Sequence, residues 1–248
     1  MKLIIFDLDG TLAESKQPLT AEMAGLFSKL LEKLPVGIIS GGALSQFLKQ
    51  VVARLPVEAN LSHLYLLPTS GAALYEFRGD DWKKVYEERL SEKDKDVIET
   101  AIREAVEETG VIKFSDQMWG ERLEYRGGQV SFSALGQQAP VALKKDWDPD
   151  KSKRRALQAA IQKLLPKCFT AAMGGMTTID VTKAGVDKAY GIHKLCERLK
   201  ISEPDALYIG DELGAGGNDE AVYKTTVETK SVADPVKTML LIEEIIAA

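Results

Sequence analysis

Two aspartates separated by one residue, Asp7 and Asp9, follow the first apolar run of the chain, which ends at Phe6. A short, continuously apolar run is typical of a strand buried on both faces of a parallel sheet. Ligands of open α/β sheets bind at the carboxyl ends of the strands, and a turn at Gly10 can bring both acids to one phosphate. One carboxylate can then attack phosphorus while the other protonates the leaving oxygen. The alternative is a solvated Asp-Gly turn.

Two later segments can contact the same phosphate. Ser40 ends a predicted strand at 37–39 and can donate its hydroxyl, and Gly41 and Gly42 let the backbone approach a ligand closely. Lys188 begins a predicted helix and can neutralise negative charge on a phosphoryl group. Taken alone, the first segment is also compatible with an ordinary turn and the second with a surface lysine.

A glycine-rich loop with several acids follows the apolar strand predicted at 207–209. Carboxylate and amide oxygens in such a loop suit Mg²⁺, although a flexible surface loop has the same composition. The candidate ligands are the carboxylates of Asp211 and Asp7, the backbone carbonyl of Asp9, and the side chains of Asn218 and Asp219. The last two can instead hold water and the Lys188 ammonium. Several acids around one phosphate repel each other, so charge alone requires a metal ion and the lysine.

The elements at both ends of the chain follow a β/α rhythm. Helical spacing behind a Thr20 cap predicts a helix over 20–34, followed by a buried strand at 36–39. Further elements are expected as a helix at 44–55, a strand at 65–67, a hairpin of 72–77 and 82–86, a helix from 187 to 199, a strand at 206–209, a helix after 217, a strand at 226–228 and a last helix after 234.

The middle of the chain has another character. A helix is expected over 92–109, and alternating hairpins over 121–126 with 129–135 and over 168–173 with 176–183, each around a Gly-Gly pair. A helix from Asp148-Pro149 to near Leu165 lies between them, and its basic cluster at 151–155 indicates a solvated helix start. The sequence therefore predicts an α/β fold: a doubly wound, Rossmann-like parallel sheet from 1–83 and 185–248, with an antiparallel α+β insertion at 84–184.

The segment Asp7-Leu8-Asp9-Gly10-Thr11-Leu12 resembles the first motif of the haloacid dehalogenase superfamily. The other three segments occur in the order that this superfamily requires. The resemblance implies that Asp7 becomes an aspartyl phosphate and that Asp9 is the general acid and base. It also implies that the insertion is a cap of the second class, which closes over the catalytic core and selects the substrate.

Several segments are similar to the phosphomannomutases of eukaryotic type, namely 68–71, 123–128, 174–181, 185–188 and 216–219. Alternation places Thr178 and Asp180 on one strand face, which can meet a sugar. The resemblance implies that these two residues bind sugar hydroxyls and that Arg126 binds a substrate phosphate. Without the resemblance, Thr178 and Asp180 indicate only a solvated sheet face, and Arg126 indicates a surface arginine paired with Glu124.

The chain departs from the mutase pattern where the mutases carry further arginines, because it has Gln137 and Lys144 there. A mutase holds a bisphosphate in two orientations and needs strong anion sites, and glutamine carries no charge. Lys144 can supply part of that charge. We therefore expect a Mg²⁺-dependent sugar-phosphate phosphatase. The alternatives are a phosphomannomutase or other hexose phosphomutase, and a noncatalytic binding member of the fold. The complete set of Asp7, Asp9, Ser40, Lys188 and Asp211 argues against the noncatalytic alternative.

Composition excludes several other classes of protein. The formal net charge of −5 gives no positive field for nucleic acid or an anionic membrane, so the expected partner is a small phosphorylated molecule. The two cysteines form no CxxC pair, which indicates a reducing compartment such as the cytoplasm. No run reaches the length of a membrane span. A monomer or a homodimer is expected, the dimer by resemblance only.

Overall fold

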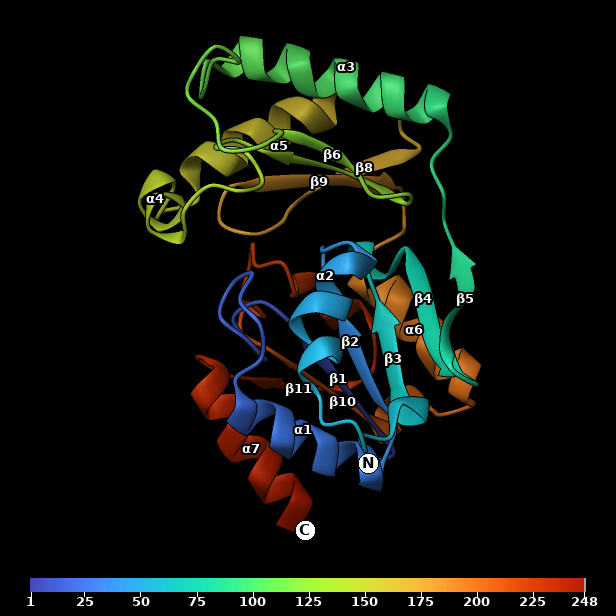
Figure 1. Cartoon of the computed structure of the whole chain (residues 1–248). Coiled ribbons are helices and arrows are strands. Elements are labelled where there is room, and N and C mark those ends of the chain that lie inside the picture. The colour runs from blue at the N-terminus through green and yellow to red at the C-terminus, as the bar shows by residue number, and fades with distance from the viewer. Residues whose placement is uncertain (248) are drawn as a thin grey trace. The chain divides into compact units, whose positions relative to one another are not determined.

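The computed structural model describes residues 1–247, which fall into two compact units (Figure 1). The first, called here the core unit, consists of Met1–Glu87 and the chain from Asp187 onward. The second, called the inserted unit, consists of Glu88–Val186. The insertion was expected at 84–184. Each unit has its own sheet and its own hydrophobic cluster, so each is described by itself.

The core unit is built on one seven-stranded sheet. Its strands are β1 (Leu3–Asp7), β2 (Val36–Ile39), β3 (Leu64–Leu67), β4 (Ala73–Arg78), β5 (Asp81–Glu87), β10 (Ala206–Gly210) and β11 (Glu228–Ser231). Their order is β11-β10-β1-β2-β3-β4-β5. The pairs from β11 to β3 are parallel and the last two pairs are antiparallel. The predicted α/β class is confirmed.

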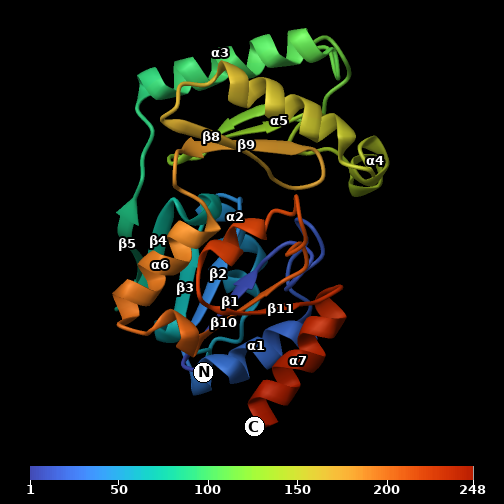
Figure 2. The ribbon, with the colours of Figure 1, turned by 180° about the vertical axis from the view of Figure 1, so that it is seen from behind.

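Helices cover both faces of this sheet (Figures 1 and 2). They are α1 (Ala21–Lys33), α2 (Leu44–Gln50), α6 (Lys188–Leu199) and α7 (Pro235–Ala247), with short 3-10 turns at Val52–Arg54, Leu61–His63, Thr69–Gly71, Glu203–Asp205 and Glu220–Lys224. In β1, Ile4 and Phe6 face the cluster that includes α1 and α7, whereas Leu3 and Ile5 face the cluster that includes α6. Because both faces are covered, the strand is apolar throughout.

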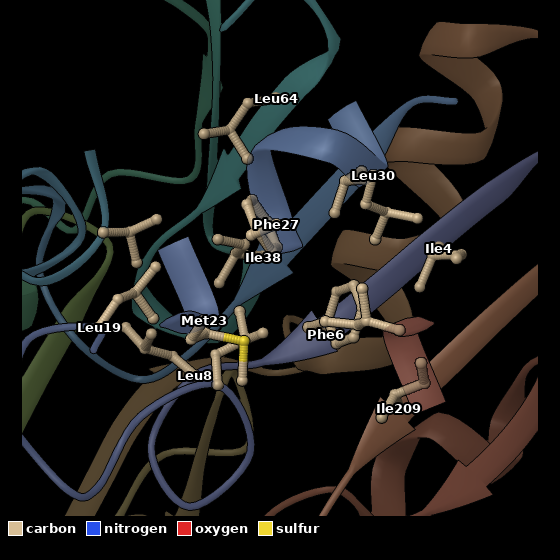
Figure 3. Close-up of a cluster of buried hydrophobic side chains, with 14 of the residues drawn as sticks. Ile4, Phe6, Leu8, Leu19, Met23, Phe27, Leu30, Ile38, Leu64 and Ile209 are labelled. Carbon is tan, nitrogen blue, oxygen red and sulfur yellow. The ribbon is translucent and has the colours of Figure 1, made fainter. Parts of the chain in front are cut away.

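Helix α1 shows how the sequence encodes this packing. The Thr20 hydroxyl caps the helix by accepting a hydrogen bond from Met23 N at 3.1 Å. Apolar residues three and four positions apart then share one face. On that face Phe27 is fully buried and packs against Phe6 of β1, with ring centroids 5.9 Å apart (Figure 3).

The inserted unit has a four-stranded antiparallel sheet in the order β6-β7-β9-β8. Its elements are α3 (Glu92–Thr109), β6 (Leu123–Tyr125), β7 (Gln129–Ser133), α4 (Val141–Trp147), α5 (Ser152–Leu164), β8 (Phe169–Met173) and β9 (Thr178–Lys183). Helices α3 and α5 pack side by side on one face of the sheet (Figure 2). The other face carries polar side chains, as the alternation predicts.

Two expectations about the inserted unit were wrong. Helix α4 was not predicted, and α5 begins at Ser152 rather than at Asp148. The reason is that the Asp148 carboxylate lies before the helix and accepts hydrogen bonds from Lys153 N at 2.9 Å and from Arg154 Nε at 2.7 Å. Arg154 is buried in this ion pair, so it does not belong to a solvated helix start.

Two expectations near the C-terminus also need correction. The helix predicted after Gly217 is only the 3-10 turn at Glu220–Lys224, and the strand predicted at 226–228 is β11, which begins at Glu228. The backbone turns back at Asp219, whose N–H donates to Glu212 O at 3.2 Å. The Asp219 carboxylate is also held by Lys188 and by Glu212 N, and the chain after it forms only this short turn.

The α1 packing gives a first prediction. Phe27→Ala removes a fully buried ring and leaves a cavity, so we expect the free energy of unfolding to fall by about 3–5 kcal/mol. Urea unfolding followed by circular dichroism measures this change. Lys29→Ala, on the exposed face of the same helix, is the control and should change stability by less than about 0.5 kcal/mol. Equal losses in the two variants would contradict this account of the core.

Candidate active site

The register of the core sheet brings four segments to one edge. Asp7 is the last residue of β1, and in the register of β2 it lies opposite Ile39, one residue before Ser40. On the other side, Phe6 lies opposite Ile209, so Asp211 follows β10 just beyond Asp7. The carboxyl ends of parallel strands therefore collect these side chains, as the sequence predicted.

The turn after β1 is closed by a glycine. Gly10 has a φ of +95°, and a Cβ at this position would lie 2.4 Å from Asp211 Oδ2. A larger residue is excluded both by the backbone conformation and by the Asp211 carboxylate. Gly10 thus lets Asp211 approach the turn, where its Oδ1 also accepts a hydrogen bond from the Thr11 hydroxyl at 3.1 Å.

Lys188 lies at the centre of the site. It begins α6, which Asp187 caps by accepting from Tyr190 N at 3.1 Å. The buried ammonium donates to Asp7 Oδ1 and to Asp219 Oδ1, both at 2.5 Å. Burial lowers the pKa of Lys188, but the carboxylates of Asp219 and Asp7 outweigh burial and raise it overall. The lysine is therefore held as a cation.

Asn218 and Asp219 both face this ammonium. Asn218 Oδ1 accepts from Lys188 at 3.0 Å. Asp219 is fully buried, and its carboxylate also accepts from the Tyr208 hydroxyl at 2.5 Å and from Glu212 N at 3.1 Å. The contacts of both side chains fit the role of holding the lysine, and their role as metal ligands stays a prediction.

Three carboxylates form one acidic cluster. Single oxygens of Asp7, Asp211 and Asp219 all lie within 4.8 Å of one another. Burial raises the pKa of Asp7 well above its usual value, against the opposing effect of Lys188. Burial and the Asp219 charge raise the pKa of Asp211 to about 6. When ionised, three acids beside one ammonium leave an excess of negative charge, and two of these acids, Asp7 and Asp219, are buried.

This cluster can hold a divalent cation. Asp7 Oδ2 is buried and has no hydrogen-bond partner among residues 1–247, which is costly for a carboxylate oxygen unless a ligand meets it. Oxygen ligands of this kind suit a hard cation such as Mg²⁺. The residues present therefore fit a metal ion held by Asp7 and Asp211, with Asp219 beside them.

The Asp9 carboxylate is directed elsewhere. Its Oδ1 accepts from Lys16 N at 2.6 Å and its Oδ2 from Gln46 Nε2 at 3.0 Å. The backbone carbonyl of Asp9 as a metal ligand, and its side chain as general acid and base, stay predictions.

Ser40 and the glycines after it are held by a neighbouring turn. Ser40 is buried, and its Oγ accepts from Gly42 N at 3.3 Å, which leaves its own proton to donate. Ser70 N donates to Ser40 O and Thr69 N to Gly42 O, each at 2.9 Å. Thr69 and Ser70 have φ values of 54° and 57°, the left-handed region that residues other than glycine rarely adopt. A strained turn thus positions the loop of Ser40, Gly41 and Gly42.

The predicted substrate residues of the inserted unit lie on and beside the polar face of its sheet. Arg126 donates to Glu124 at 2.6 Å and to Gln137 Oε1 at 3.2 Å. Lys144 Nζ donates to Gln137 O at 3.2 Å, so both cations contact this one glutamine. The pairing of Arg126 with Glu124, expected as an alternative, is present.

Thr178 and Asp180 lie on the same face of β9, opposite Ser133 and Ser131 of β7. A Cβ at Gly174 would lie 2.5 Å from Asp180 Oδ2, so the glycine makes room for this side chain.

Sequence reasoning missed three residues of the core site. Tyr208 holds Asp219, Thr11 holds Asp211, and Gln46 holds Asp9. Thr11 stood inside the first motif and was the easiest to find. Tyr208 is part of an apolar strand, and only its hydroxyl, which must find a partner when buried, hinted at a polar contact.

The chain belongs to the haloacid dehalogenase-like hydrolase family, because the sequence model of that family matches residues 4–219. The phosphomannomutase of Saccharomyces cerevisiae is 25% identical over 239 residues, which are 95% of this chain and 89% of that protein. The phosphomannomutase of Spinacia oleracea is 24% identical over 252 residues, covering 98% and 95%. The resemblance inferred from the motifs is thereby confirmed.

Solved structures show the same fold. The IMP-bound, N-terminally truncated IMP-nucleotidase of Plasmodium falciparum matches with a TM-score of 0.71 at 16% identity, over 100% of this chain and 68% of that chain. A haloacid dehalogenase-like hydrolase from Bacteroides thetaiotaomicron matches with a TM-score of 0.63 at 16% identity, over 98% and 99%. In the described chain, no helix has the length and apolar character needed to cross a membrane.

The raised acid pKa values predict how Mg²⁺ acts on stability. An acid whose pKa is higher in the folded state contributes stability at low pH, and this contribution is lost as pH rises through the folded pKa, about 6 for Asp211. Because Mg²⁺ binds the ionised acids, we expect about 10 mM Mg²⁺ to raise the melting temperature more at pH 7.5 than at pH 5. Differential scanning fluorimetry measures both shifts.

The control for this prediction is a matched pair of variants. Asp211→Asn should lose most of the Mg²⁺ shift, whereas Asp205→Asn, in an exposed ion pair with Lys2, should keep it. A full shift in Asp211→Asn would rule out this cluster as the magnesium site.

Proposed function

We propose that the chain is a Mg²⁺-dependent phosphatase that hydrolyses a sugar phosphate through an aspartyl phosphate on Asp7. The observation that carries this proposal is the state of the Asp7 carboxylate. Lys188 binds one oxygen at 2.5 Å, and the other oxygen is buried without a hydrogen-bond partner in the described chain. Such an oxygen is desolvated, which favours nucleophilic attack.

In the first half-reaction, one oxygen of the Asp7 carboxylate attacks phosphorus in line with the ester oxygen, and the other is left to Lys188 and to the metal ion that Asp7 and Asp211 would hold. The P–O bond to the sugar breaks, and the leaving alkoxide takes the proton of the Asp9 carboxyl group. Lys188 stays beside Asp7 and opposes the negative charge of the phosphoryl oxygens. The Ser40 hydroxyl donates to the phosphate, and Gly41 and Gly42 let the backbone approach it closely.

In the second half-reaction, the Asp9 carboxylate takes a proton from water. The water oxygen attacks phosphorus, the bond to Asp7 breaks, and inorganic phosphate leaves. Both carboxyl groups return to their starting forms. When bound, Mg²⁺ supplies positive charge that offsets the repulsion between the phosphate and the acids that hold the ion.

Removal of the nucleophile tests this mechanism. Asp7→Asn keeps the shape of the side chain but weakens its nucleophilicity, so we expect kcat on a panel of hexose phosphates to fall by a factor on the order of 10⁴ or more. Release of inorganic phosphate in the presence of Mg²⁺ is the measurement. Asp81→Asn, exposed at the start of β5, serves as the control with unchanged turnover. Turnover retained by a folded Asp7→Asn protein would refute the nucleophile assignment.

The sugar class is proposed from the inserted unit and from the relatives. Thr178 and Asp180 lie on one polar face of β9. By resemblance, they match the sugar-binding positions of the phosphomannomutases. Arg126 and Lys144 meet at Gln137 and supply positive charge for a phosphate. We assign the inserted unit the role of substrate selection.

A second candidate function is a hexose phosphomutase, in which a sugar hydroxyl replaces the attacking water. The phosphomannomutases that this chain resembles, and the two cations at Gln137, favour it. Two observations favour the phosphatase instead. The resemblance to the mutases implies an arginine where this chain has Gln137, and Glu124 pairs with Arg126 and reduces its net charge.

The two functions differ in their products. Given hexose 1-phosphate, Mg²⁺ and a hexose bisphosphate activator, the protein is expected to form inorganic phosphate faster than hexose 6-phosphate. Both products are measured in one sample, by phosphate detection and by coupled oxidation of the 6-phosphate. Faster isomerisation than release would replace the phosphatase with the mutase, and no reaction with any ester would favour a noncatalytic member of the fold.

A further inference from the structure

Gln46 contacts a residue of the proposed mechanism, although no motif pointed to it. It lies on α2, in the helix that follows the Ser40 loop. Its amide Nε2 donates to Asp9 Oδ2 at 3.0 Å across 37 residues of sequence. The contact joins the turn after β1 to the helix after β2.

The Asp9 carboxylate is held at both oxygens. Lys16 N donates to Oδ1 at 2.6 Å, and Gln46 donates to Oδ2. Each carboxylate oxygen has two lone-pair sites, so each keeps one for a proton in transit. Two neutral donors thus fix the orientation of the group without cancelling its charge and without blocking it.

Gly42 provides the space for this arrangement. A Cβ built on Gly42 would lie 2.3 Å from Gln46 Oε1 and 2.7 Å from Gln46 Cδ. The amide of Gln46 therefore passes over the glycine on its way to Asp9. The residue type at position 42 is explained by this contact as well as by close approach of the backbone to a phosphate.

We propose that Gln46 is a positioning residue for Asp9, which it orients for proton transfer to the leaving oxygen and from the attacking water. This assignment rests on the proposed phosphatase function. A general acid must lie within hydrogen-bond distance of the atom that it protonates, so a carboxylate that loses one of its two anchors spends less time in the productive orientation.

The test separates proton transfer from the rest of the reaction. Gln46→Met keeps the length of the side chain and removes the donor. With a hexose 6-phosphate, whose alkoxide needs a proton, the single-turnover rate should fall about tenfold, a fraction of the usual effect of general acid catalysis. With 4-nitrophenyl phosphate, whose leaving group needs no proton, the burst of nitrophenolate should stay within about twofold of the wild type.

A further variant makes the result specific. Lys49→Met places the same new side chain at an exposed position of the same helix and should leave the ratio unchanged. An unchanged ratio in Gln46→Met, with the wild type active, overturns the role of Gln46 and leaves the phosphatase standing.

A stability cycle reports on the contact without any turnover. Urea midpoints are measured for the wild type, Gln46→Met, Asp9→Ala and the double variant. Non-additive shifts are expected because the two side chains share a hydrogen bond, and additive shifts overturn the contact. If the wild type turns over no phosphate ester, the proposed function fails, and the assignment of Gln46 fails with it.

Gly42→Ala gives an independent check. The new methyl group displaces the flexible end of Gln46, so this variant should show the same substrate-selective loss as Gln46→Met. The double variant Gly42→Ala/Gln46→Met should lose no more in the rate ratio than either single variant. A further loss in the double variant would show that Gly42 acts on the ratio by another route.

Discussion

The contact between the Lys188 ammonium and the carboxylates of Asp7 and Asp219 is the interaction on which the rest of the site depends. All three groups are almost fully buried, and the two N–O distances are 2.5 Å. Removing one partner from such a buried group leaves an uncompensated charge and typically costs about 3–5 kcal/mol. The same contact occupies one oxygen of Asp7 and leaves the other for chemistry.

A strained turn supports the loop of Ser40, Gly41 and Gly42. Thr69 and Ser70 lie in the left-handed region, which costs roughly 1–2 kcal/mol for each such residue. The hydrogen bonds from their N–H groups to the Ser40 loop offset part of that cost. Gly71 ends the turn, and a Cβ there would lie 2.7 Å from Gly191 Cα of α6. The turn and the helix that begins with Lys188 therefore pack backbone against backbone.

The sequence predicted the parts of the site that depend on topology. Asp7, Ser40 and Asp211 each follow a buried apolar strand, and parallel strands bring such positions together. Lys188 was predicted from its place in the series of four segments that the superfamily requires in this order. The contacts of Tyr208 and Gln46 were not predicted, because a hydrogen bond between side chains 11 or 37 residues apart depends on rotamers and on the space beside a glycine. The burial of Arg154 was missed for the same reason. Its partner Asp148 lies outside α5, and only the folded chain brings the two side chains together.

The position of β1 has a consequence for how the chain folds during synthesis. This strand lies between β2 and β10, so one of its two edges stays open until residues 206–209 have been made. A ribosome that adds about 5–20 residues per second leaves this apolar edge without its partner for on the order of ten seconds or more. By the end of that time, all residues of the hydrophobic cluster of Glu88–Val186 have been made. The strand that carries Asp7, the proposed nucleophile, is thus among the last strands of the sheet to be enclosed.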